Sequence, residues 1–193
     1  SFDFQSNQFL LAFSGGPDSV YLLWMLFLYY QSELRNHILL CYINYHDSPY
    51  VTKEEEIVFY YIHKFNLPYQ KYDVFYNKEQ DKNFEEWARD YRYDLFKKIV
   101  EENHLKGVIT AHQKTDVVET YLLQKQRNNL PLYYGLKDKN NLYGLTVYRP
   151  LLSISKKELT NRLDQEAIPY YFDITNTNLK KKTNKIRSEL KEE

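Results

Sequence analysis

The sequence predicts an α/β fold with a doubly wound, mostly parallel sheet and helices on both of its faces. Short apolar runs alternate with helical stretches of about ten or more residues, which implies right-handed crossovers between parallel strands. The length of 193 residues, with 43% hydrophobic content, is enough for one domain with a sizeable core. In sheets of this type, ligands bind beyond the carboxyl ends of the strands.

The first expected elements lie between residues 9 and 45. The apolar run 9–13 ends before a pair of glycines, which predicts a buried strand. Residues 20–30 are rich in leucine, a good helix former, and predict the first helix. Residues 37–45 form another apolar run, which predicts a second buried strand.

The next helix is expected to begin at Thr52, whose side chain can cap it. The glutamates at 54–56 then lie in its first turn, where they suit the positive end of the helix dipole. This helix is expected to end near Pro68, because proline disfavours helical backbone in the residue before it. Residues 69–75 alternate weakly between apolar and polar and predict a third strand.

The second half of the chain continues the alternation of helices and strands. Residues 84–103 have helical spacing, with apolar and aromatic side chains on one side. Ser155 and Glu158 fit a capping box that opens another helix. The other expected elements are a strand at 107–111, a helix at 115–126, an extended stretch at 142–152 and a last strand at 168–172.

Composition excludes several classes of protein. The 26 basic residues are balanced by 26 acidic ones, which excludes a generally polycationic coat for nucleic acid. A single cysteine, Cys41, excludes a disulfide framework, a CxxC redox pair and a cysteine-rich zinc site. The start of the chain does not read as a signal peptide, and no apolar run is long enough to cross a bilayer. We therefore expect a soluble, cytoplasmic protein without membrane contact.

A glycine turn separates the first predicted strand from the first predicted helix, and its sequence is Ser14-Gly15-Gly16-Pro17-Asp18-Ser19. The two glycines let the backbone approach a ligand closely, and the following helix points its N-terminal amides at the turn. This arrangement binds anions, most naturally phosphate. Asp18 would repel a phosphate unless a cation stood between them, so the turn also predicts Mg²⁺. The alternative is an ordinary strand-to-helix turn with a capping serine.

The glycine turn resembles the PP-loop of the ATP pyrophosphatases, which cleave ATP to AMP and pyrophosphate. That superfamily includes NAD, GMP and asparagine synthetases, tRNA thiolases and tRNA(Ile)-lysidine synthetases. The turn matches neither a Walker A sequence nor a Gly-x-Gly-x-x-Gly fingerprint. The resemblance implies that Ser14, Gly15, Gly16, Pro17, Asp18 and Ser19 bind ATP, and that Asp18 holds Mg²⁺ and is catalytic.

Residues 110–120, Thr-Ala-His-Gln-Lys-Thr-Asp-Val-Val-Glu-Thr, resemble the lysidine synthetase motif Thr-Ala-His-x-x-Asp-Asp-x-x-Glu-Thr. Thr115 stands in place of the first acid of the motif. The resemblance implies that His112 contacts the nucleotide, that Asp116 and Glu119 are catalytic, and that Glu119 is also a metal ligand. Asp116 and Glu119 share one helical face, where two carboxylates can hold a metal ion or an ammonium group. The alternative is that they only complement the helix dipole.

Residues 85–93 resemble the family's Glu-x-x-Ala-Arg-x-x-Arg-Tyr segment. The resemblance implies that Arg89 or Arg92 faces the ATP phosphates and acts in catalysis. The alternative reading is a surface ion pair between Glu85 and Arg89, which is worth only about 0.3 kcal/mol.

Further likeness continues to the C-terminal part of the chain. His46 stands where the family carries a histidine-rich strand end, which implies contact with ATP, although a lone histidine is often structural. Residues 148–152 resemble the family's Arg-Pro-Leu-Leu segment, and 173–176 and 184–187 resemble two later elements. The residues expected to contact tRNA are Lys180, Lys181, Lys182 and Arg187; the alternative for the lysines is a solvated charge run.

The resemblance as a whole implies a PP-loop ATP-binding catalytic domain over 1–178. Residues 179–193 would be a basic helical tail that opens a tRNA-binding region. The implied enzyme uses ATP and Mg²⁺ to ligate free L-lysine to C2 of the wobble cytidine in tRNA(Ile) with a CAU anticodon, through an adenylated tRNA. Two alternative hypotheses remain: another PP-loop enzyme that modifies tRNA, such as a thiolase, and a non-enzymatic nucleotide-binding module.

Overall fold

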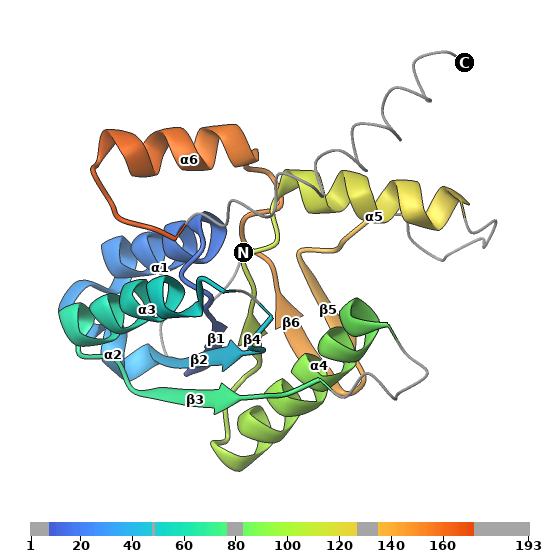
Figure 1. Ribbon diagram of the computed structural model, residues 1–193, viewed down its shortest axis with the longest axis horizontal. Coiled ribbons are helices and arrows are strands. Elements are labelled where there is room, and N and C mark those ends of the chain that lie inside the picture. Colours follow the sequence, from blue (N-terminus) through green and yellow to red (C-terminus); the bar gives the residue numbers. More distant parts are fainter. Residues whose placement is uncertain (1–7, 48, 77–82, 127–134, 172–193) are drawn as a thin grey trace.

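The computed structural model describes residues 8–47, 49–76, 83–126 and 135–171, which form one six-stranded sheet with flanking helices (Figure 1). The strands are β1 (Phe9–Ala12), β2 (Ile38–Asn44), β3 (Tyr69–Asp73), β4 (Val108–Ile109), β5 (Lys139–Leu142) and β6 (Leu145–Tyr148). Their order is β3-β2-β1-β4-β6-β5, and every neighbouring pair is parallel except β5 with β6. The predicted fold class is confirmed.

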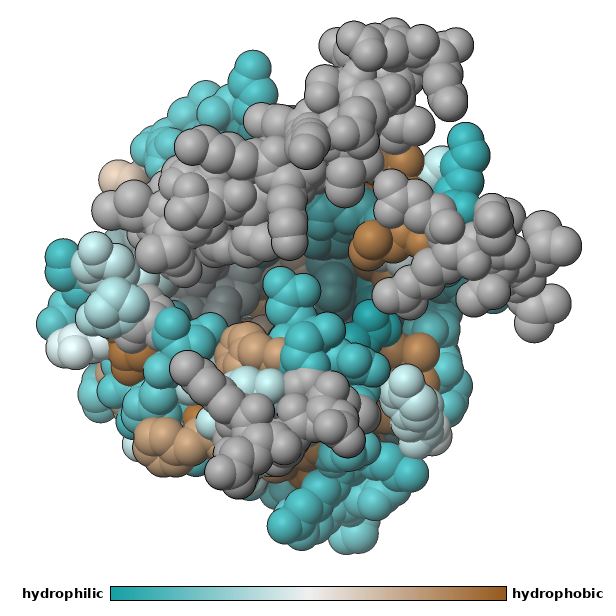
Figure 2. Space-filling view, turned by 45° about the vertical axis from the view of Figure 1, so that its right-hand side comes forward, coloured by the Kyte–Doolittle hydropathy of each residue, from teal (hydrophilic) through white to brown (hydrophobic). Residues whose placement is uncertain are grey.

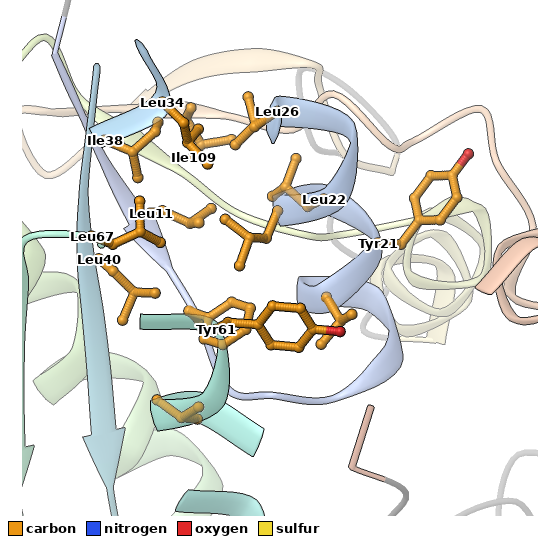
Figure 3. Packing of buried hydrophobic residues seen from close by; sticks show 14 of the residues in the cluster. Leu11, Tyr21, Leu22, Leu26, Leu34, Ile38, Leu40, Tyr61, Leu67 and Ile109 are labelled. Carbon is orange, nitrogen blue, oxygen red and sulfur yellow. The ribbon is translucent and has the colours of Figure 1, made fainter. Parts of the chain in front are cut away.

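Helices cover both faces of this sheet. They are α1 (Pro17–Tyr30), α2 (Leu34–His37), α3 (Val51–Phe65), α4 (Phe84–Glu102), α5 (Lys114–Gln126) and α6 (Lys156–Gln165), with a 3₁₀ turn η1 (Gln31–Glu33) after α1. Because side chains alternate along a strand, Leu11 packs with α1, α3 and α6, whereas Leu10 packs with α4 on the opposite face. Figure 3 shows the first of these cores, where Leu11 and Leu40 of the sheet face Leu22 of α1. None of the described helices has the length and hydropathy of a membrane span.

The strand register determines where a ligand can bind. In the middle of the sheet, Leu11 of β1 aligns with Leu40 of β2 on one side and with Ile109 of β4 on the other. The chain runs outward from β1 through β2 to β3, and then crosses back through α4 to β4 on the other side of β1. The segments that leave β1 and β4 therefore diverge, which leaves a crevice at the carboxyl edge of the sheet.

Several helix ends follow their sequence signals. Asn83 caps α4 by accepting a hydrogen bond from the backbone amide of Glu86 at 2.9 Å. The predicted capping box of Ser155 and Glu158 is present at the start of α6. The predicted cap at Thr52 is wrong, because α3 already begins at Val51 and its N-cap residue makes no side-chain capping bond.

Two predicted extended segments differ from the structure. The stretch predicted at 142–152 turns back on itself at Tyr143 and Gly144, whose φ values of 54° and 84° suit a tight hairpin between β5 and β6. Within the strand predicted at 168–172, residues 168–171 form no strand. Pro169 lacks an amide donor for a ladder, and the Tyr171 amide donates instead to the carbonyl of Gly15 at 2.8 Å.

Gly107, just before β4, is expected to tolerate no side chain. Its φ is 154°, and an added Cβ would press on the carbonyl oxygen of Thr146 and lie 2.9 Å from Tyr148 Cε2. Gly107→Ala should therefore lower the free energy of unfolding by about 3 kcal/mol, measured by urea denaturation at pH 7. Gly144→Ala, which would meet the flexible end of Lys97, should cost about 1 kcal/mol. Equal stability of the two variants would contradict this account.

Candidate active site

The glycine turn is closed by hydrogen bonds among its own residues. Ser14 Oγ lies 3.3 Å from Ser19 Oγ, and Ser19 Oγ donates to the carbonyl of Gly16 at 3.1 Å. Gly15 has a φ of 75°, and an added Cβ would lie 3.3 Å from Val58 Cγ2, so a side chain there would be strained. Because Pro17 occupies the first turn of α1, its missing amide costs no helical hydrogen bond. The turn thus directs the N-terminus of α1 at the crevice.

Asp18 forms an ion pair that the sequence did not reveal. Lys156 Nζ, from the first turn of α6, lies 2.6 Å from Asp18 Oδ2. The other carboxylate oxygen, Oδ1, is buried and has no hydrogen-bond partner among the described residues. Burying a carboxylate oxygen without a partner is costly, and an incoming cation would relieve that cost. Asp18 therefore fits the role of a metal ligand.

The N-termini of α1, α5 and α6 lie close together at this edge of the sheet. The backbone amide of Lys114, at the start of α5, donates to the carbonyl of Ile154 at 3.0 Å, just before α6 begins. Asp18 in the first turn of α1 reaches the first turn of α6 through Lys156. Helix N-termini carry partial positive charge, so their convergence favours an anionic ligand such as a polyphosphate.

Asp116 lies in the first turn of α5, where its Oδ2 accepts a hydrogen bond from the Gln113 amide at 2.7 Å. Burial raises the pKa of Asp116; the Gln113 hydrogen bond opposes this, the Asp18 carboxylate adds to it, and Lys156 opposes it. These interactions mean that Asp116, Asp18 and Lys156 share one electrostatic environment. A carboxylate with a raised pKa is better able to accept a proton near neutral pH.

His112 follows β4 and lies in the same crevice. Its Nδ1 is 2.8 Å from Thr110 Oγ1. Burial, and after it the positive charges of Arg149, Arg92 and Arg89, together lower the pKa of His112 to about 4. The imidazole is therefore neutral at pH 7 and can serve as a hydrogen-bonding group, consistent with the predicted contact to nucleotide.

The two predicted arginines of α4 occupy different positions. Arg92 lines the cleft, and its Nε donates to the Tyr45 hydroxyl at 3.4 Å, while that hydroxyl donates to the carbonyl of Ala88 at 3.3 Å. Arg89 is exposed and lies outside the cleft lining, although its charge reaches His112. The geometry therefore favours Arg92 as the arginine that meets a bound phosphate.

His46 is not part of the cleft lining, although its neighbours Tyr45 and Asp47 are. Its Nε2 is 3.0 Å from Asp73 Oδ1, and its ring stacks on Phe75 with centroids 4.3 Å apart. Its backbone amide donates to Asn44 Oδ1 at 2.8 Å. Contact between His46 and ATP remains a prediction.

The described residues enclose a cleft of ≈ 380 Å³ at the carboxyl edge of the sheet. This volume is in the range of small-molecule sites. Figure 2 shows the molecule hollowed in the middle of the view, with hydrophilic side chains deep in the hollow. Of the residues predicted from sequence, the lining includes Ser14, Asp18, Ser19, Arg92, His112 and Asp116. Other lining residues, for which no site role was predicted, include Cys41, Asn44, Tyr45, Asp47 and Glu54.

A metal ion would have few protein ligands here. Over the described ranges, no three His, Cys, Asp or Glu side chains gather as a metal site. Mg²⁺ typically takes only one or two carboxylates from the protein and completes its shell with phosphate oxygens and water. Asp18, with its unpartnered Oδ1, suits that mode. The other predicted ligand, Glu119, lies three residues beyond Asp116 on α5 and is not part of the cleft lining.

Some predicted residues lie outside the described ranges. These are Lys180, Lys181, Lys182 and Arg187, together with the whole predicted tail at 179–193. Their contact with tRNA remains a prediction.

A family model described as a PP-loop domain matches residues 2–193. The chain belongs to the PP-loop domain family. The matched residues include the glycine turn at the start of α1, the part of the chain that resembles the PP-loop.

Similar proteins from several bacteria are called tRNA(Ile)-lysidine synthase. The chain is 39% identical to the one from Mycoplasma mycoides subsp. mycoides SC, over 97% of this chain and 46% of that protein. It is 37% identical to the one from Mesoplasma florum, over 95% of this chain and 46% of that protein. The chain thus spans about half the length of these relatives.

Solved structures support the fold. A U34-tRNA thiolase, NcsA from Methanococcus maripaludis, superposes with a TM-score of 0.67 at 14% identity, over 86% of this chain and 59% of that chain. An FMN adenylyltransferase from Candida glabrata superposes with a TM-score of 0.53, also at 14% identity, over 88% of this chain and 50% of that chain. At such low identity the likeness concerns the fold alone.

The low pKa of His112 should make stability depend on pH. The ordinary histidine pKa is 6.5 and the folded value is about 4, so the unfolded chain binds the proton more readily. The stabilisation is fully present above pH 6.5 and is lost as the pH falls towards 4. Urea denaturation should show a loss of about 2 kcal/mol between pH 7 and pH 5 from this group.

His112→Gln keeps a polar side chain without a titrating ring, and serves as the matched comparison. Between pH 7 and pH 5, the free energy of unfolding of this variant should fall by about 2 kcal/mol less than that of the wild type. If both proteins respond equally to pH, the assignment of this effect to His112 is wrong.

Proposed function

We propose that this PP-loop domain ligates free L-lysine to C2 of the wobble cytidine in tRNA(Ile) with a CAU anticodon, through an adenylated tRNA. The observation that carries the proposal is the meeting of a PP-loop, Asp116, His112 and Arg92 in one cleft. Relatives called tRNA(Ile)-lysidine synthase, which share 37% and 39% identity over nearly the whole chain, support it.

The first step would be transfer of AMP from ATP to the cytidine. The C2 oxygen of cytidine attacks the α-phosphorus of ATP, a P–O bond forms, and pyrophosphate leaves. The PP-loop residues and the convergent helix N-termini would hold the departing pyrophosphate. Arg92 would offset the negative charge that develops on the transferred phosphate, with Arg89 one turn away.

A magnesium ion would be held by Asp18, with Glu119 as the second predicted ligand. When bound, the ion would neutralise phosphate charge. The buried and unpartnered Oδ1 of Asp18 supports this role, because a cation would provide the missing interaction.

The second step would be attack of the lysine ε-amine on C2 of the adenylated cytidine. A C–N bond forms, the C–O bond to AMP breaks, and AMP leaves. The ε-ammonium must first lose a proton, since only the neutral amine is a nucleophile. Asp116 would receive the ammonium and its proton, and its raised pKa supports that role. Glu119, on the same face of α5, would help to hold the lysine charge.

Thiolation of tRNA is the second candidate. It is suggested by the fold shared with the thiolase, a likeness of fold alone. Sulfur transfer generally relies on several cysteines or a cysteine-held cluster, whereas this chain has only Cys41. Burial raises the pKa of Cys41 to about 12, which disfavours the reactive thiolate. A non-enzymatic nucleotide-binding module would have no use for a catalytic carboxylate such as Asp116.

Asp18→Asn and Glu119→Ala should each abolish AMP formation that depends on both lysine and tRNA. Asn at position 18 removes the negative charge that would hold the metal, and Ala at 119 removes a carboxylate from the α5 face. The test is incubation of this chain with ATP, Mg²⁺, labelled lysine and tRNA(Ile), with AMP and label transfer as readouts. We expect a loss of at least about 100-fold.

Asp47→Asn is a matched control, because Asp47 lines the cleft but has no proposed role. It should keep most of the wild-type rate. Full turnover in Asp18→Asn or Glu119→Ala would remove that residue from the mechanism. A requirement for a sulfur donor would favour thiolation, and no reaction would favour the binding module.

Neutralising Lys180, Lys181 and Lys182 together to glutamine should weaken tRNA binding. Each lost phosphate contact reduces counterion release, so the plot of log affinity against log salt should become flatter. Filter binding between about 50 and 200 mM salt would measure this slope. An unchanged slope would show that these lysines do not contact the RNA backbone.

A further inference from the structure

The ion pair between Lys156 and Asp18 occupies the carboxylate that the proposed reaction assigns to magnesium. We propose that Lys156 keeps divalent metal out of the cleft until a nucleotide binds, so that metal binding depends on nucleotide. This proposal rests on the proposed role of Asp18 as a metal ligand. It gives Lys156 a positioning role in the order in which ligands enter the cleft.

The backbone of Lys156 is firmly held, while its side chain has room to move. The capping box of Ser155 and Glu158 sets the start of α6, and Leu159 in the next turn is fully buried. Arg162 Nη1 donates to the Tyr21 hydroxyl at 3.0 Å, which ties α6 to α1 one turn further on. The Lys156 side chain is 42% exposed, so its ammonium can leave Asp18 without any shift of the helix.

Charge balance explains why the ammonium and a metal ion would compete. Asp18 and Asp116 contribute two negative charges to this environment, and Lys156 contributes one positive charge. With Lys156 in place, Oδ2 of Asp18 is already paired at 2.6 Å, and only Oδ1 remains. A hydrated Mg²⁺ gives up its water reluctantly. A single carboxylate with one oxygen already paired to an ammonium group is therefore a weak ligand for it.

A bound triphosphate would make metal binding at Asp18 favourable. Its oxygens would sit at the convergent helix N-termini, within reach of the first turn of α6. They offer Lys156 a new anionic partner, and they add oxygen ligands for a metal ion. Asp18 would then be released to bind the metal together with the phosphate.

A purely structural salt bridge is the competing explanation. In that case Lys156 would serve to hold α6 against α1, and its loss would lower stability without raising affinity for metal. Leu159 and Leu163 of α6 are both fully buried in the core that contains α1. The docking of the two helices is therefore already provided by apolar packing, and a half-exposed ion pair adds little to it.

The test is manganese binding without nucleotide, measured from the loss of the EPR signal of free Mn²⁺. Lys156→Met keeps the apolar stem and removes the charge, so we expect Mn²⁺ affinity to rise roughly tenfold or more over the wild type. Lys157→Met is the matched control, because it makes the same change of charge one residue away at an exposed position. It should leave Mn²⁺ affinity close to the wild-type value.

Asp18→Asn added to Lys156→Met should return the affinity to the wild-type value, because the new site needs the Asp18 carboxylate. Equal Mn²⁺ affinity in Lys156→Met and Lys157→Met would overturn the proposal, and so would a gain that survives Asp18→Asn. Lys156→Gln provides the same test if the methionine variant does not fold. Since ATP, lysine and tRNA are absent from the assay, its outcome is independent of whether the chain makes lysidine.

Discussion

The parallel pairing of β1 with both β2 and β4 is the constraint on which the site depends. It brings three carboxyl strand ends to one edge of the sheet, and every segment that follows a strand there can contribute a side chain. Asn44 and Tyr45 come from the end of β2, Asp18 from the turn after β1, and His112 from the segment after β4. A shift in either pairing would separate these groups even if every side chain were unchanged.

The cleft also contains two regions that differ in the sign of their charged side chains. Around His112 the charges of three arginines are positive, and burial together with these charges holds the pKa of His112 low and keeps its ring neutral. Around Asp18 and Asp116 negative charge is balanced by Lys156 and by the helix N-termini. A nucleotide bridges such regions naturally, since its polyphosphate suits the helix ends and its cation suits the carboxylates. The division lets one small cleft hold anions and cations side by side.

The features that could be predicted from sequence are those encoded locally. Apolar runs, the PP-loop, the capping box and the spacing of Asp116 and Glu119 each lie within about a dozen residues, so the pattern itself is visible. The pair of Asp18 and Lys156 spans 138 residues and depends on where α6 docks, which no local pattern encodes. The strand predicted at 168–172 failed for a related reason. Its apolar residues pack on the core, but its backbone donor at Tyr171 is taken by Gly15.

That hydrogen bond also limits where the rest of the chain can act. The Tyr171 amide is fixed to the carbonyl of Gly15, so the chain leaves the described domain at the PP-loop itself. Lys180 follows nine residues later, and covalent geometry keeps its backbone within about 30 Å of Tyr171 whatever path the chain takes. In the proposed function, the contact between Lys180 and tRNA therefore lies no further than about this distance, plus the length of the lysine side chain, from Tyr171. The backbone hydrogen bond between Tyr171 and Gly15 thus limits the distance between the proposed RNA contacts and the loop that would bind ATP.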